Sequence, residues 1–179
     1  MISRRVVLLL ALGACGDDAT TSPDAAVAID AAIDAAPGGL PTTCTGACAT
    51  TSLTAMISST RTFDLAYYGV NATGTLHVEV YKGMQPGCPT MSSPTPDYTL
   101  ILGAVPAPTS TAMTTSPGNV LDYQGDLLGG PLGKAASSVM LTPVAYQAGT
   151  FLALDATLAF DPGTATGHVY ATHCASLDD

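Results

Sequence analysis

Period-two alternation between apolar and polar residues in two long segments constrains the fold of this chain more than any other feature. In residues 75–82 every second residue is apolar, so Leu76, Val78 and Val80 share one face of an extended chain. Residues 152–161 repeat this alternation over a longer span. Because a helix would scatter these apolar residues around its surface, both segments are predicted to be β-strands with one buried face.

Turn-forming residues separate further strand-like segments, which together predict about seven strands. The predicted strands are 63–68, 72–82, 98–102, 120–128, 139–146, 150–160 and 164–174. This pattern predicts an all-β domain over residues 44–179, either a single antiparallel β-sandwich or a partly open barrel. Pro143 indicates an edge strand or a bulge at its position. Residues 50–59 fit either a short helix or a first strand.

Composition and charge exclude some classes of partner. Five Lys and Arg residues stand against fourteen Asp and Glu residues, which gives a formal net charge of −9. Nucleic acid is therefore not an expected partner, because binding phosphates requires clustered cations. No run of eighteen apolar residues occurs, so no helix of the mature chain is expected to cross a membrane.

The N-terminal residues have the layout of an export signal. Two arginines, Arg4 and Arg5, precede the short apolar run 6–14, which ends at Leu12-Gly13-Ala14-Cys15. This tetrapeptide resembles the lipobox of bacterial lipoproteins. The resemblance implies that residues 1–14 are a signal peptide and that Cys15 is lipidated through a thioether to diacylglycerol. Two or more acyl chains anchor a protein stably to a membrane.

The lipoprotein resemblance also implies a bacterial cell-envelope location, facing the periplasm or the cell exterior. Neither the membrane nor its face is specified by the residues. Arg4 and Arg5 fit both the general export route and the twin-arginine route. Residues 15–43 are rich in Ala and Asp and form the predicted lipidated acidic tether. The strand-rich domain that follows resembles the small extracytoplasmic β-sandwich domains of such lipoproteins.

Once Cys15 is assigned to lipid, four cysteines remain: Cys44, Cys48, Cys88 and Cys174. An even number of cysteines in an exported domain predicts two disulfides. The favoured pairing joins one of the two opening cysteines to Cys174 and the other to Cys88, which would clamp the two ends of the domain together. The pairing of Cys44 with Cys48 and of Cys88 with Cys174 remains open.

No metal site or cofactor is predicted. Cys44-x3-Cys48 and His168-x4-His173 each match half of a zinc-finger pattern, but far more residues separate the halves than a finger allows. Oxidation to disulfides would also remove the thiolate ligands.

Local catalytic signatures are weak. Glu79 is the only glutamate of the chain, and with His77 it is expected to face solvent at a sheet edge rather than to perform acid–base chemistry. Exposed Tyr81, Tyr98 or Tyr123 would offer rings on which a sugar can stack.

The predicted function is a non-catalytic binding domain, with a protein or a polysaccharide as ligand. Strand faces or the loops 83–97 and 103–119 would carry the contacts. One alternative is a secreted hydrolase whose site is assembled from scattered residues, and another is a structural envelope protein.

Overall fold

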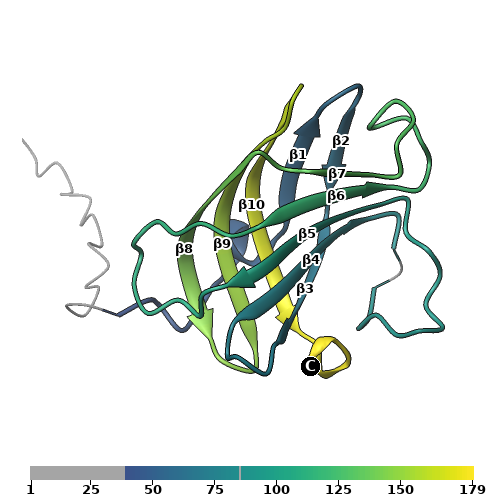
Figure 1. The fold of residues 1–179 in the computed structure, drawn as a ribbon. Coiled ribbons are helices and arrows are strands. Elements are labelled where there is room, and N and C mark those ends of the chain that lie inside the picture. The colour runs from purple at the N-terminus through teal and green to yellow at the C-terminus, as the bar shows by residue number, and fades with distance from the viewer. Residues whose placement is uncertain (1–38, 85) are drawn as a thin grey trace, which may run out of the picture. The chain divides into compact units, whose positions relative to one another are not determined.

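The computed structural model describes residues 39–84 and 86–179, and these residues form an all-β domain (Figure 1). The strands are β1 (Ser52–Met56), β2 (Thr60–Phe63), β3 (Leu65–Val70), β4 (Leu76–Lys82), β5 (Tyr98–Val105), β6 (Gly118–Asp122), β7 (Gly133–Ala135), β8 (Ser138–Gln147), β9 (Phe151–Ala159) and β10 (Thr164–His173). Two short 3-10 helices, η1 (Gly46–Ala49) and η2 (Ala175–Leu177), flank them. The predicted all-β class is confirmed.

The strands form one curled sheet of ten strands, where about seven strands in a sandwich or a partly open barrel were expected. The predicted strand 63–68 is divided at Asp64, so that β2 ends and β3 begins there. The undecided segment 50–59 contains β1, and a short additional strand, β7, extends the sheet beyond β6. A single curled sheet is closer to the partly open barrel than to two separate layers.

β10 is the junction of the sheet, because it pairs with three other strands. Along one edge it pairs with β9 over nearly its whole length, from Thr164 to Thr172. Along the other edge its first half pairs antiparallel with β1, and its end, at Thr172 and His173, pairs parallel with β3. From β3 the sheet continues through β4, β5, β6 and β7.

Alternation along the strands places one apolar face inside the curl, as residues 75–82 and 152–161 predicted. The largest fully buried side chains come from strands all around the sheet: Tyr68, Phe63, Leu53, Leu76, Leu100, Leu102, Leu141, Leu152, Leu154, Leu158 and Val78. They belong to one continuous cluster of buried residues. Because every strand except β7 contributes to the same cluster, the domain has a single main core.

Loops cover the outer edge of β8. Thr114 and Leu141 exchange two backbone hydrogen bonds of 2.8 Å, and the Tyr146 amide donates to the Pro41 carbonyl at 2.9 Å. Pro143 lies in this edge strand at a register shift between Pro143 and Ala145. Both expectations for Pro143, an edge and a bulge, are confirmed. These contacts occupy part of the edge backbone and so limit pairing with another chain.

The signal peptide 1–14, Cys15 and the tether up to residue 38 lie outside the described residues. Within the part of the chain that the structure describes, no helix has the length and apolar character needed to cross a membrane.

Candidate functional site

The most distinctive polar cluster lies on the outer face of β4. This strand runs between β3 and β5, so its side chains lie in the middle of the sheet and not at an edge as expected. Because Leu76, Val78 and Val80 point into the core, His77, Glu79 and Tyr81 share the outer face. The sequence had therefore predicted the face correctly but not the position within the sheet.

Glu79 is held by both of its outer-face neighbours. His77 Nε2 lies 2.9 Å from Glu79 Oε1, and the Tyr81 hydroxyl donates to Glu79 Oε2. The Glu79 side chain is 19% exposed and that of His77 is 29% exposed. The hydrogen bond to Glu79 raises the pKa of His77 above its ordinary value, although partial burial acts in the opposite direction. A partly buried carboxylate is thus fixed in place and still reachable from solvent.

On the same outer face a small satellite cluster supports the site. Tyr67, Tyr81 and Cys174 are buried together, and Met84 packs against them. The Tyr67 and Tyr81 rings are 6.2 Å apart between centroids, a distance typical of interacting aromatic pairs. Tyr81 is therefore locked by packing on its ring while its hydroxyl bonds Glu79.

Loop 83–97 folds back over this cluster. The Cys88–Cys174 disulfide ties the loop to the residue that follows β10, and the Gly87 amide donates to the Tyr67 hydroxyl at 2.6 Å. At the end of the loop the Asp97 amide donates to the Lys82 carbonyl at 2.9 Å. These three connections fix the loop as one wall of a groove.

The groove between this loop and the outer face of β4, β5 and β6 has a volume of about 280 Å³. Its lining residues are Glu79, Tyr81, Met84, Pro89, Thr90, Ser93, Pro94, Thr95, Pro96, Thr99, Ile101, Leu121 and Tyr123. The set combines one carboxylate, several hydroxyl groups and apolar rings. A concave site with a few placed polar groups on a largely apolar surface is the usual form of a ligand-binding site.

Of the three tyrosines expected to serve as stacking platforms, only Tyr123 is exposed, at 42%. Tyr81 is buried in the satellite cluster. Tyr98 is buried too, and its hydroxyl donates to Asp126 Oδ1 at 2.6 Å. Asp126 also pairs with Arg61, so this acid is part of a structural network.

The four cysteines of the domain form two disulfides, as predicted, but the favoured pairing is wrong. The bonds are Cys44–Cys48 and Cys88–Cys174. The Cys48 carbonyl accepts a hydrogen bond from His168, which precedes Cys174 by about 20 Å of extended strand. A disulfide requires Cα atoms closer than about 7 Å, so neither opening cysteine reaches Cys174.

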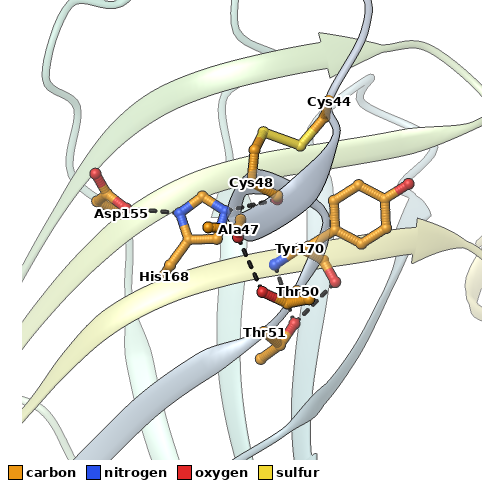
Figure 2. The surroundings of a disulfide bond; sticks show 8 residues. All are labelled: Cys44, Ala47, Cys48, Thr50, Thr51, Asp155, His168 and Tyr170. Atoms are coloured by element: carbon orange, nitrogen blue, oxygen red, sulfur yellow. Dashed lines mark hydrogen bonds and ion pairs between the residues drawn. A yellow bond between two sulfur atoms is a disulfide. The ribbon is translucent and has the colours of Figure 1, made fainter.

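Figure 2 shows how the Cys44–Cys48 loop is attached to the sheet. His168 Nδ1 lies 2.7 Å from Asp155 Oδ1, while Nε2 donates to the Cys48 carbonyl at 2.9 Å. The Thr51 hydroxyl bonds both backbone groups of Tyr170, donating to its carbonyl at 2.9 Å and accepting from its amide at 3.0 Å. His168 therefore holds the start of the domain on β9 and β10.

No protein-family model, no curated protein and no solved structure matches the chain.

The groove itself was not predicted, because it depends on how loop 83–97 folds back over the sheet. One signal in the sequence pointed to it. The single glutamate of the chain lies shortly before a loop rich in Pro, Ser and Thr that contains a cysteine. Such a loop, when a disulfide ties it to the sheet, can lie over a nearby strand face.

Proposed function

We propose that this domain is a non-catalytic carbohydrate-binding domain, carried by a lipid-anchored protein of the bacterial cell envelope. The observation that carries the proposal is the Glu79 carboxylate, held by His77 and Tyr81 at the groove beneath loop 83–97. Hydroxyl groups and apolar rings surround this carboxylate.

The chemistry of the groove suits a neutral sugar. Sugars present hydroxyl groups at their edges and C–H groups on their ring faces. An ionised carboxylate has about four acceptor positions, so Glu79 retains capacity for sugar hydroxyls beyond its two present partners. The hydroxyl-bearing residues Thr90, Ser93 and Thr99 are among those that line the same groove, and its prolines with Tyr123 supply apolar surface for ring faces.

The make-up of the groove supports binding rather than hydrolysis. Glu79 is the only carboxylate among the described residues that line it. Most glycoside hydrolases require two carboxylates on either side of the scissile bond. A secreted hydrolase is the second candidate, because a partly buried glutamate beside a histidine is a combination that general acid–base catalysis uses.

Binding is tested on the full-length chain carrying Cys15→Ser, so that no lipid is attached. Linear hexasaccharides of glucose and of N-acetylglucosamine are titrated by calorimetry. We expect at least one to bind, and Glu79→Gln to weaken binding about tenfold or more through loss of charge-assisted hydrogen bonds.

Asp161→Asn is the matched control for that experiment, because it removes the same charge at an exposed turn outside the groove. Absence of binding, or equal binding by Glu79→Gln, would overturn the proposal. Mass spectrometry of the saccharides after incubation with the protein tests the second candidate function, a hydrolase. Shortened products that disappear with Glu79→Gln would identify a hydrolase instead.

The lipid anchor is a separate part of the proposal and rests on the Leu12–Cys15 motif. The two disulfides are compatible with an extracytoplasmic location. In bacteria fed a labelled fatty acid, the unmodified chain should carry the label and Cys15→Ser should release it in soluble form. Labelling of Cys15→Ser would refute Cys15 as the acylation site.

A further inference from the structure

A second hollow adjoins the groove on the outer face of the sheet. It has a volume of about 320 Å³ and is lined by Ile101, Gly103, Pro117, Gly118, Asn119 and Ala135. Ile101 lines both the groove and this second hollow. The two depressions are therefore neighbours that share a residue of β5.

The two hollows follow one another along β5 and β6. The β5 residues that line them are Thr99 in the groove, Ile101 in both and Gly103 in the second hollow. On β6, Leu121 pairs with Thr99 and Asn119 pairs with Ile101, which keeps the same order. At about 3.4 Å per strand residue, Thr99 and Gly103 are about 14 Å apart. This length exceeds one sugar ring.

The chemical character of the lining residues changes from the groove to the second hollow. The groove holds the Glu79 carboxylate and several hydroxyls, whereas the described residues of the second hollow carry no charge and only one polar side chain, that of Asn119. Several residues that line the second hollow are small, so they leave open space above the sheet. A Cβ placed on Gly103 would meet no atom within 4 Å, so the space above it is open.

We propose that the groove and the second hollow form one extended site for a linear, uncharged polysaccharide. This inference rests on the proposed function. The polar end orients one sugar unit through Glu79, and the apolar end receives the face of a further unit of the same chain. An uncharged ligand fits because the second hollow offers no counter-charge. A long polymer fits because both hollows are open at the surface and follow one another along two strands.

The test compares a disaccharide with a hexasaccharide of the sugar that binds best. The full-length chain that carries only Cys15→Ser, the parent chain, should bind the hexasaccharide at least tenfold more tightly than the disaccharide. Gly103→Leu, which fills the second hollow, should weaken hexasaccharide binding to the level of the disaccharide and leave disaccharide binding unchanged. Ala135→Leu is an independent second variant, because Ala135 is exposed and lines the same hollow.

Ala72→Leu is the matched control, because Ala72 is an exposed alanine that lines neither hollow. This variant should bind both saccharides as the parent Cys15→Ser chain does. Equal affinity of the parent Cys15→Ser chain for the two saccharides would overturn the extended site. Unchanged hexasaccharide binding in folded Gly103→Leu and Ala135→Leu would do so as well. These results do not contradict binding in the Glu79 groove. If neither saccharide binds, both proposals are overturned.

Discussion

Removing the Cys88–Cys174 disulfide should destabilise the domain far more than removing Cys44–Cys48. The two bonds close loops of very different length, with sequence separations of 86 and 4 residues. In the chain-entropy model, constraining the unfolded chain over the longer loop contributes about 4.6 kcal/mol, and over the shorter one about 2 kcal/mol. The difference in the free energy of unfolding is therefore expected to be about 2.5 kcal/mol.

The measurement is urea unfolding followed by far-ultraviolet circular dichroism, without reductant and in the Cys15→Ser chain. The double variant Cys88→Ala/Cys174→Ala is compared with the double variant Cys44→Ala/Cys48→Ala. Cys174 is fully buried, so its truncation adds a packing loss in the same direction. Cys88→Ala alone keeps the Cys174 side chain and separates the cross-link from that packing loss.

Two results would refute this reasoning. One is an equal or larger loss of stability when the short-loop bond is removed. The other is a loss below about 2 kcal/mol for the Cys88→Ala variant, since the loop entropy alone exceeds that value. Peptide mapping after non-reducing digestion should recover Cys88 and Cys174 in one linked pair.

Two further predictions concern the outer face of β3 and β4. Gly69→Ala should destabilise the domain by about 1–3 kcal/mol, because a Cβ there would overlap the Leu177 carbonyl, whereas Gly103→Ala should change stability by less than about 0.5 kcal/mol. Urea unfolding of both variants checks this, and equal stability of the two would contradict it. The raised pKa of His77 means that its bond to Glu79 contributes stability fully below the unfolded pKa, near 6.5, and loses that contribution as pH rises through the folded pKa. His77→Asn should therefore cost more stability at about pH 5 than at about pH 9, and an equal cost at both would show that protonation of His77 is not involved.

The strands were largely predictable because alternation reports directly on which residues face a core. Residues 152–161 predicted the buried face of β9, and the segment 164–174 matches β10 almost to the residue. The division at Asp64 was not predictable, since apolar residues continue on both sides of it. A corner between two strands depends on which neighbours each strand finds, and that information is not local.

The disulfide pairing and the groove were unpredictable for a related reason. The count of cysteines predicts two bonds but says nothing about which strands become neighbours. Cys88 meets Cys174 because β10 ends beside β3, and β3 pairs with β4, from which loop 83–97 departs. The same neighbourhood brings the loop over Glu79. One parallel contact, at Thr172 and His173, therefore determines both features.

The place of β10 in the sheet also has a consequence for the timing of folding. β10 is the last of the ten strands to leave the ribosome, yet it joins β9, β1 and β3 into one sheet. Before it emerges, the β1–β2 hairpin has no other strand partner, and two strands alone are marginally stable in water. The core therefore closes only after nearly all of the domain has been synthesised, by contacts between residues far apart in the sequence, which form slowly. Until β10 emerges, the chain can form only partial sheets, such as β3 to β7 and the β8–β9 hairpin, and these lack the strand that joins them to each other and to β1.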